Sequence, residues 1–388
     1  MDFTLNEDQQ AFQDTARAFA QQQMAPFAAE WDEKKIFSKE LYAKAGELGF
    51  CGLYTPEEAG GMNLSRLDSA IVLEELAAGC TSTAAFISIH NMATWMIATW
   101  GRESTVAQWC GDLTQGKKLA SYCLTEPGAG SDAGSLRSTA KKQGNHYLLN
   151  GSKMFISGAG DTDVLVVMAR TGTQEDGSAG ISAFAIPAQL EGIHYGKNEA
   201  KMGWNSQPTR AISFENVVVD EDNLLGDEGE GFKIAMRGLD GGRINIATCS
   251  IGAAQACINH SQGYMLERQQ FGKPLAAFQA LQFKLADMVT ELIAARQMVR
   301  LAASKLDADD IDKSTYCAMA KRFATDAGFS ICNDAMQLHG GYGYLKEFPL
   351  ERFMRDARVH QILEGTNEIM RVITARRLFE EGAPEALR

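Results

Sequence analysis

The sequence of 388 residues lacks the patterns that mark metal centres, disulfide frameworks and serine hydrolases. Its eight cysteines are scattered without a C-x-x-C pair, which argues against a zinc cluster or a disulfide framework and favours a reduced, intracellular setting. Its six histidines show no H-x-x-x-H spacing. The sequence also has no G-x-S-x-G motif and supports no Ser–His–Asp assignment. We therefore predict no metal site.

Positive charge is also scarce, because 37 lysines and arginines stand against 49 aspartates and glutamates, which gives a net charge of −12. An acidic chain without a basic run is a poor candidate for binding nucleic acid or an anionic membrane surface. It can still bind an anionic small molecule through a few local arginines.

One stretch alone, Ser82–Trp100, is nearly long enough to span a bilayer without a charged residue. It contains polar side chains, so we predict a buried core helix and no membrane insertion. The start, Met1–Leu5, lacks a basic and then apolar leader, so no secretory signal is expected. A bacterial cytoplasm is the simplest location, and the mitochondrial matrix is the alternative if the chain is a processed form.

A chain of this length predicts two or three domains, and three blocks differ in their residue pattern. Residues 1–119 are predicted to form a helical domain. Asn6 and Gln9 have the spacing of a capping box, and apolar residues at helical spacing follow them. Further apolar helical runs cover Leu41–Leu48 and Leu67–Ala78.

Residues 120–228 have the pattern of strands separated by turns. Three segments without helical periodicity look like strands: Asp163–Ala169, Ile181–Ile186 and Ala211–Val219. Asn150-Gly151 stands between two further apolar segments and is a signal for a two-residue hairpin turn. We predict a mainly antiparallel sheet or barrel, because no helical segment is available for a βαβ crossover.

Residues 229–388 return to a helical period. Apolar residues repeat with a 4-3-4-3 spacing, which is typical of a long helix in an antiparallel bundle. They are Leu281, Leu285, Met288, Leu292, Ala295, Val299 and Ala302. The fold class is therefore α+β and mostly helical, with a helical N-terminal domain, a β domain in the middle and a C-terminal helical bundle.

Two glycine clusters are candidate ligand loops. Gly128–Ala133 matches G-x-G-x-x-A, but Glu126-Pro127 precedes it and a β segment follows it, so we reject a Rossmann site. A loop whose backbone amides approach a phosphate remains open. Gly340–Gly343 is more simply a helix C-cap followed by a turn, with a loop for a bulky ligand as the alternative.

Four further residues carry chemistry that could be functional. Glu364 lies at a break in an apolar helical run, just before Thr366, a candidate N-cap. A carboxylate at such a break can face a pocket, although most glutamates are simply solvated. Arg243, Arg268 and Arg376 could each bind phosphate, or could form surface ion pairs.

Five motifs occur in one order along the chain and resemble the acyl-CoA dehydrogenase family over essentially its whole length. They are Tyr122–Asp132 (YCLTEPGAGSD), Asn150–Ser157 (NGSKMFIS), Arg268–Gly272 (RQQFG), Gln337–Gly341 (QLHGG) and Leu363–Thr366 (LEGT). Three more segments resemble the isobutyryl-CoA dehydrogenases of valine breakdown: Ser88–Met92, Gly203–Thr209 and Asp240–Ile246.

The resemblance implies FAD as cofactor, an acyl-CoA as substrate and electron transfer flavoprotein as electron acceptor. It implies a C-terminal bundle of four helices and a homotetramer built as a dimer of dimers. The reaction would be α,β-dehydrogenation of a short branched acyl-CoA, isobutyryl-CoA giving methacrylyl-CoA. A short-chain or 2-methylbutyryl-CoA dehydrogenase, an acyl-CoA oxidase, and a non-catalytic flavin- or CoA-binding relative are the alternatives.

The resemblance also assigns residues to the ligands. The residues expected to bind FAD, partly across a subunit interface, are Tyr122, Cys123, Leu124, Thr125, Gly130, Ser131, Phe155, Ile156, Ser157, Arg268, Phe271, Phe278, Gln279, Gln337, Leu338, His339, Gly340, Gly341, Thr366, Asn367 and Glu368. Those expected to bind substrate are Ser131, Asp240, Gly241, Gly242, Arg243, Gly365 and Arg376, with Asp240–Arg243 forming a loop.

Glu364 matches the position of the family's catalytic base. An α-proton of a thioester is a very weak acid, so its removal needs a base of matched pKa and stabilisation of the enolate. Burial against the flavin and an apolar acyl pocket would raise the pKa of Glu364. We expect Ile89, Met92 or Met96 to supply the far wall of that pocket.

Overall fold

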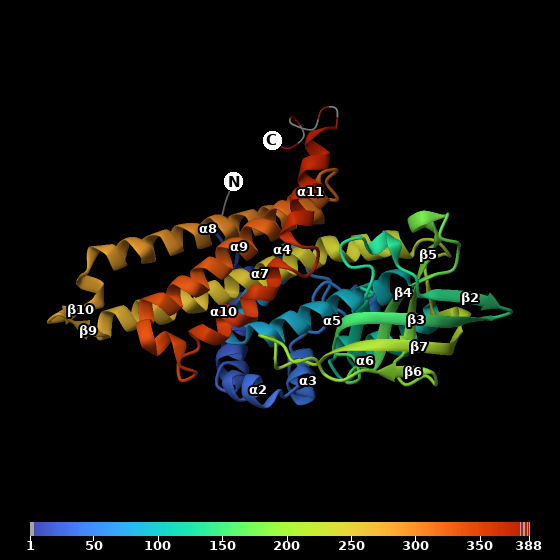
Figure 1. Cartoon of the computed structure of the whole chain (residues 1–388), viewed down its shortest axis with the longest axis horizontal. Coiled ribbons are helices and arrows are strands. Elements are labelled where there is room, and N and C mark those ends of the chain that lie inside the picture. Colours follow the sequence, from blue (N-terminus) through green and yellow to red (C-terminus); the bar gives the residue numbers. More distant parts are fainter. Residues whose placement is uncertain (1–3, 381, 383–384, 386, 388) are drawn as a thin grey trace.

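The computed structural model describes residues 4–380, 382, 385 and 387. Helices of the first and last thirds of the chain pack side by side, and the sheet formed by the middle of the chain lies at one end of the molecule (Figure 1). The order predicted from the sequence, helical, β and helical, is confirmed.

The N-terminal third contains six α-helices among the described residues: α1 (Glu7–Phe19), α2 (Ala28–Lys34), α3 (Lys39–Glu47), α4 (Arg66–Gly79), α5 (Thr81–Trp100) and α6 (Glu103–Thr114). The predicted capping box is present, because the Asn6 side chain accepts a hydrogen bond from the Gln9 backbone N–H at 2.8 Å. The Asn6 N–H in turn donates to Gln9 Oε1 at 3.2 Å. These bonds satisfy amides at a helix start that have no partner within the helix.

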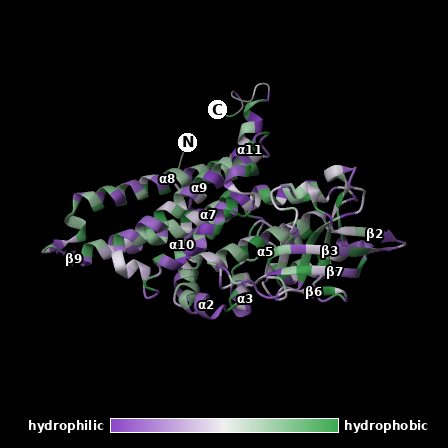
Figure 2. Ribbon diagram, viewed as in Figure 1, coloured by the Kyte–Doolittle hydropathy of each residue, from purple (hydrophilic) through white to green (hydrophobic). Residues whose placement is uncertain are grey.

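Helix α5 is the uncharged stretch noted in the sequence, and it is a buried core helix as predicted (Figure 2). Its polar side chains bond to neighbouring backbone. Asn91 accepts from the Leu53 N–H at 2.7 Å and donates to the Phe50 carbonyl at 2.8 Å. His90 accepts from the Ala120 N–H at 3.1 Å. Within the described residues, no helix is long and apolar enough to cross a membrane.

The middle of the chain forms an eight-stranded sheet. Its strands are β1 (Ala120–Cys123), β2 (Thr139–Gln143), β3 (His146–Ser157), β4 (Val164–Arg170), β5 (Ile181–Pro187), β6 (Ile193–Tyr195), β7 (Thr209–Asp220) and β8 (Leu224–Leu225). The order is β6-β7-β3-β2-β4-β5-β8, with β1 beside β4. Only β1–β4 and β2–β4 pair in parallel, so the prediction of a mainly antiparallel sheet is confirmed for the described strands.

The predicted hairpin turn at Asn150-Gly151 is wrong, because β3 runs through both residues. The turn lies earlier, at Gly144, whose φ is 63°. Gly151 instead lies opposite a bulge in β7, because one residue of β3 between Leu149 and Gly151 faces two residues of β7 between Val217 and Phe214. The glycine is needed there because a Cβ would lie 2.3 Å from the Ser138 hydroxyl oxygen. The dipeptide Asn-Gly thus faces a bulge here, and its sequence alone does not distinguish this position from a hairpin turn.

The C-terminal part contains the long helices α7 (Gly231–Glu267), α8 (Gln279–Asp307) and α9 (Lys313–His339), and the shorter helices α10 (Leu350–Arg358) and α11 (Asn367–Leu378). A small hairpin of β9 (Gln269–Gln270) and β10 (Lys273–Pro274) joins α7 to α8. The predicted apolar stripe of α8 faces the bundle, with its members from Met288 to Ala302 buried. Helix α4 also packs along α7, which joins the N-terminal helices to the bundle.

Candidate active site

Glu364 lies in a short turn between a 3₁₀ turn (Val359–Gln361) and α11. Its φ is 55° and that of Gly365 is 89°, so two successive residues are in the left-handed region. Such a backbone costs on the order of 1 kcal/mol for a residue other than glycine and persists where surrounding contacts fix it. Thr366 is the N-cap of α11, as predicted, and its side chain accepts from the Ile369 N–H at 3.3 Å.

The carboxylate of Glu364 points into the protein. The residue as a whole is half-buried, but its Oε2 atom is buried and has no hydrogen-bond partner among the described residues. Burial raises the pKa of this carboxyl to about 7, and the positive charges of Arg243 and Lys321 act in the opposite direction. A carboxylate with this pKa can accept a proton at neutral pH, as a general base must.

The segment Asp240–Arg243 is helical, so the predicted loop is wrong: it forms part of the third turn of α7. Glycine is a poor helix former, yet two glycines stand here because side chains from elsewhere occupy the space of their Cβ atoms. A Cβ on Gly242 would lie 2.5 Å from Glu364 Oε2, and one on Gly241 would lie 2.4 Å from Arg66 Nη1. The two glycines therefore admit Glu364 and Arg66 against the helix.

Arg243 is buried, and its Nη1 donates to Asp240 Oδ1 at 2.7 Å. Ser314 donates to the other oxygen of Asp240 at 2.5 Å. Arg243 Nε also donates to the Glu364 carbonyl, at 3.4 Å. These two predicted substrate residues thus lie directly beside the predicted base, and Arg243 supports its backbone.

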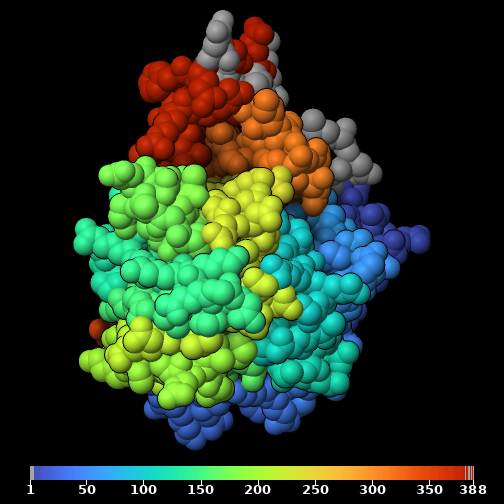
Figure 3. Space-filling model, turned by 90° about the vertical axis from the view of Figure 1, so that its right-hand side faces the viewer, coloured from blue at the N-terminus to red at the C-terminus, as the bar shows by residue number. Residues whose placement is uncertain are grey.

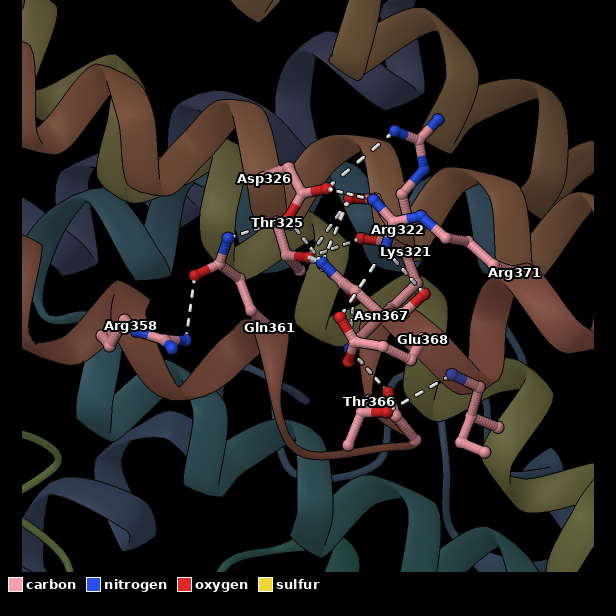
Figure 4. Close-up of polar contacts among 12 residues, drawn as sticks. Lys321, Arg322, Thr325, Asp326, Arg358, Gln361, Thr366, Asn367, Glu368 and Arg371 are labelled. Atoms are coloured by element: carbon pink, nitrogen blue, oxygen red, sulfur yellow. Dashed lines mark hydrogen bonds and ion pairs between the residues drawn. The ribbon is translucent and has the colours of Figure 1, made fainter. Parts of the chain in front are cut away.

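The other side of the turn is held by α9 (Figure 4). Lys321 Nζ donates to the Gly365 carbonyl at 2.7 Å and to Asn367 Oδ1 at 2.9 Å. Asn367 Nδ2 donates to Asp326 at 2.7 Å and to Thr325 at 2.9 Å. The side chain of Asn367 is therefore occupied within the protein and buried, so an FAD contact would have to come from its backbone.

Two of the segments predicted to line the flavin lie next to each other. The Met154 N–H donates to the Thr125 carbonyl at 2.8 Å, and the buried Lys153 donates to the Leu124 carbonyl at 3.0 Å. Lys153 also forms a buried ion pair with Glu126 at 2.8 Å. The end of β1 and the middle of β3 thus form one wall.

This wall fits a large planar ligand. Phe155 has a φ of 60° and is 64% exposed, an unusual exposure for a phenylalanine in a strand. The Tyr122 hydroxyl is buried without a hydrogen-bond partner among the described residues. Gly128 and Gly130, in the adjacent loop, have open space where a Cβ would point, so a ligand can approach their backbone. In the described chain a short 3₁₀ turn (Ala133–Ser135) and then strands follow the loop, not an α-helix, which agrees with our rejection of a Rossmann site.

The predicted FAD residues of the segments 268–279 and 337–341 lie at the far end of the bundle, away from the sheet (Figure 1). Tyr264 stacks on His339 with ring centroids 4.2 Å apart, and the Arg268 guanidinium lies 5.3 Å from the Tyr342 ring. Phe271, at the β9–β10 hairpin, is 92% exposed. Gly340 is the C-cap of α9, as the sequence indicated. Within one chain, this cluster does not meet the wall beside Tyr122.

Arg376 and Glu368 are exposed on α11. Arg376 lines a surface groove with residues of the turn between α8 and α9. Figure 3 shows α11 in red and this turn in orange, above the green loops of the middle domain. Ser131 lies exposed in those loops. The two predicted substrate residues outside the Glu364 cluster are thus on the surface.

Sequence reasoning missed the buried cation Arg66, which lies beside Gly241. The Arg66 guanidinium lies 3.5 Å from the ring centroid of Tyr54 and 4.9 Å from that of Trp95, and its Nη1 has no hydrogen-bond partner among the described residues. Tyr54 accepts a hydrogen bond from Asn245 of α7 at 3.2 Å. No local signal marks Arg66 as buried, since it simply follows the N-cap Ser65.

Comparisons with known proteins match all three blocks of the chain. The descriptions are acyl-CoA dehydrogenase N-terminal domain for residues 6–117, middle domain for 121–217 and C-terminal domain for 229–379. The mitochondrial isobutyryl-CoA dehydrogenase of Bos taurus is 52% identical over 97% of this chain and 90% of its own length.

Two solved structures are similar over 98% of this chain and 100% of their own. Butyryl-CoA dehydrogenase from Megasphaera elsdenii has 39% identity and a TM-score of 0.94. A chain solved in a study of the electron transferring flavoprotein of Acidaminococcus fermentans has 42% identity and a TM-score of 0.95.

Proposed function

Since the chain belongs to the acyl-CoA dehydrogenase family, whose members depend on FAD, we propose that it dehydrogenates a short branched acyl-CoA, isobutyryl-CoA to methacrylyl-CoA, in the breakdown of valine. The observation that carries the proposal is the carboxylate of Glu364. It is buried, unpaired at Oε2 and shifted in pKa to about 7. Glu364 therefore has the burial and the pKa that a base for α-proton abstraction needs, and it stands at the sequence position where the resemblance predicts the base.

The base works on the α-carbon of the thioester. Glu364 Oε2 takes the α-proton, and the electron pair of that C–H bond becomes the new carbon–carbon double bond. FAD, when bound, supplies the acceptor for the hydride that leaves the β-carbon. The backbone N–H of Glu364 donates to the thioester oxygen and stabilises the developing enolate. The left-handed turn and Gly242 hold the carboxylate within reach of the α-carbon.

The residues that would hold FAD are those of the wall and of the far-end cluster. Thr125 and Phe155, with their neighbours, would lie along the ring system, and Ser131 would lie towards the phosphates. Arg268, Phe271 and the segment from Gln337 to Gly341 would bind the rest of the dinucleotide from a second copy of the chain.

A small acyl group fits the surroundings of the base. Arg66 fills the space beside Gly241, next to the glycine that faces Glu364, and the bulky rings of Tyr54 and Trp95 pack on its guanidinium. The 52% identity to an isobutyryl-CoA dehydrogenase also supports a small acyl group as the substrate. One methylene is worth about 1–3 kcal/mol in an apolar pocket, so butyryl- and 2-methylbutyryl-CoA should react more slowly without being excluded.

The partners and location follow the same reasoning. We propose electron transfer flavoprotein as the electron acceptor. This is supported by the similarity to a chain that was solved in the study of the electron transferring flavoprotein of Acidaminococcus fermentans. We propose a homotetramer built as a dimer of dimers, as the resemblance implies. The separation of the two FAD clusters within one chain supports the pairing of two copies in each dimer. All eight cysteines are free and buried, which supports a reducing compartment such as the bacterial cytoplasm or the mitochondrial matrix.

The test uses the FAD-loaded protein and a panel of acyl-CoA thioesters with a dye acceptor. We expect isobutyryl-CoA to give the highest kcat/KM. Glu364→Gln should lower kcat by at least about 10³-fold while the flavin absorbance of the protein is kept. A preference for straight, medium-length acyl chains would refute the assignment of isobutyryl-CoA as substrate. Normal turnover of Glu364→Gln would refute the assignment of Glu364 as the base.

A further inference from the structure

Lys321 is a fully buried lysine at the centre of the bundle, and no motif of the sequence pointed to it. It lies in the middle of α9, 43 positions before Glu364 in the sequence. Burying a lysine is costly, so its charge must be compensated by partners. Its described partners are the Gly365 carbonyl at 2.7 Å and Asn367 Oδ1 at 2.9 Å, both in the segment that carries the base.

These two bonds brace a backbone that no regular element supports. Glu364 and Gly365 both have positive φ, and the turn lies outside any helix or strand. The other side-chain bond to this backbone, from Arg243 Nε to the Glu364 carbonyl, is longer at 3.4 Å. The bond from Lys321 is therefore the shorter of the two, and Asn367 ties the same ammonium to the first residue of α11 (Figure 4).

The charge of Lys321 acts on Glu364 as well. Desolvation lowers the pKa of Lys321 to about 7, and the charge of Glu364 opposes this shift. The other charged groups around it are Arg243 on α7, Asp326 on α9 and Glu368 on α11. His360, in the 3₁₀ turn before the base, is kept neutral because burial and the charge of Lys321 lower its pKa to about 3.

We propose that Lys321 is a positioning residue for the base: its ammonium fixes the turn through the Gly365 carbonyl and stabilises the ionised form of Glu364. The inference rests on the proposed function for its catalytic consequence. The link between the two side chains can nevertheless be tested without any turnover.

The kinetic test compares Lys321→Met with Lys321→Arg. Methionine removes both the bond and the charge, so we expect kcat to fall about 10–100-fold with KM changed less than about threefold. The acid limb of the pH–rate profile should move to higher pH, because Glu364 loses a neighbouring positive charge. Arginine keeps a positive charge and a hydrogen-bond donor, so the acid limb of the pH–rate profile of Lys321→Arg should stay at the wild-type position.

Lys313→Met is the matched control, because Lys313 lies at the start of the same helix and pairs only with Asp309 among the described acidic residues. It should leave kcat and the acid limb unchanged. Flavin absorbance and the melting temperature show that each variant is folded. A fall in kcat with an unmoved acid limb would overturn the proposal, since Lys321 would then be a structural residue only.

The second readout is stability. Glu364→Gln is introduced into wild-type and Lys321→Met proteins, and the melting temperature of each is measured at pH 7. Because Lys321 favours ionised Glu364, we expect the stabilising effect of Gln to be larger in the Lys321→Met protein. Equal effects in the two backgrounds would overturn the proposal. If this coupling is found but the wild-type protein shows no dehydrogenation, the proposed function fails and the placement of Lys321 stands.

Discussion

At the scale of single residues, the position of the Glu364 carboxylate depends on the absence of a side chain at Gly242. Gly242 stands in the interior of α7, where alanine would favour the helix by about 1 kcal/mol. The glycine is there because Glu364 Oε2 occupies the space that its Cβ would take. A helix position of low propensity is thus explained by chemistry elsewhere in the chain.

We therefore expect Gly242→Ala to displace the carboxylate of Glu364 and to lower kcat/KM for isobutyryl-CoA about 100-fold or more. Gly263→Ala is the matched control on the same helix, because a Cβ there meets nothing within 4 Å. It should leave the rate unchanged and raise the melting temperature slightly. Steady-state kinetics of the two variants measure the difference, and equal activities would show that the contact does not matter.

The raised pKa of Glu364 also predicts a pH-dependent stability. A carboxyl whose pKa is about 7 in the folded state and 4.5 in its unperturbed state destabilises the fold as pH rises between these values. Gln stays neutral, so Glu364→Gln should be more stable than the wild type at pH 8, by on the order of 2 kcal/mol. Denaturant unfolding at pH 8 and pH 4.5 measures this gap, which should almost vanish at the lower pH. A stability difference between Glu364→Gln and the wild type that does not depend on pH would contradict the raised pKa of Glu364.

At the scale of elements, the bulge in β7 opposite Asn150 shows that the meaning of a local sequence signal depends on the neighbouring strand. Asn150-Gly151 fits a hairpin turn, but β3 pairs with β7 on both sides of it. The Asn150 side chain accepts from the Asn216 N–H at 2.9 Å across the bulge. The strand therefore continues, because the extra residue lies in β7, where Asn216 has a φ of 52°, and Gly151 faces this bulge with a φ of 141°.

Gly151→Ala should destabilise the protein by about 2 kcal/mol or more, because a Cβ there would overlap Ser138. Gly144→Asn is the control at the true turn. Its φ is 63°, a Cβ there meets nothing within 4 Å, and asparagine tolerates this backbone. Its cost should stay below about 1 kcal/mol. Urea unfolding measures the free energy of unfolding of both variants. Similar losses of stability would mean that packing at the bulge is unimportant.

At the scale of the whole molecule, the predicted FAD residues outside Thr366–Glu368 divide into two groups at opposite ends. The wall beside Tyr122 lies at the sheet, and the cluster with Phe271 lies at the β9–β10 hairpin (Figure 1). Phe271 is 92% exposed and lies beside Phe278, with ring centroids 6.1 Å apart, and we propose that a second copy of the chain covers this pair. This division is the physical argument for a site shared between two copies.

Phe271→Glu should accordingly weaken both assembly and FAD binding. We expect a lower mass in light scattering and at least a tenfold weaker retention of the flavin on dilution. Val218→Glu is the control, because Val218 is a 55% exposed strand residue in the sheet, away from the hairpin. If the Phe271→Glu protein keeps the mass and flavin content of the control, the shared site is refuted.

The sequence by itself determined the helical and β blocks, the caps at Asn6 and Thr366, the apolar stripe of α8 and the family, because these depend on periodicity and on short motifs. Tertiary structure alone decided that Gly242, Arg243 and Lys321 lie around Glu364 and that Arg66 lies beside the adjacent Gly241. These residues come from α4, α7 and α9, and nothing local in the chain records which of them share a buried volume. The pKa of a carboxyl depends on that shared burial and charge, so it emerges only once the helices have packed.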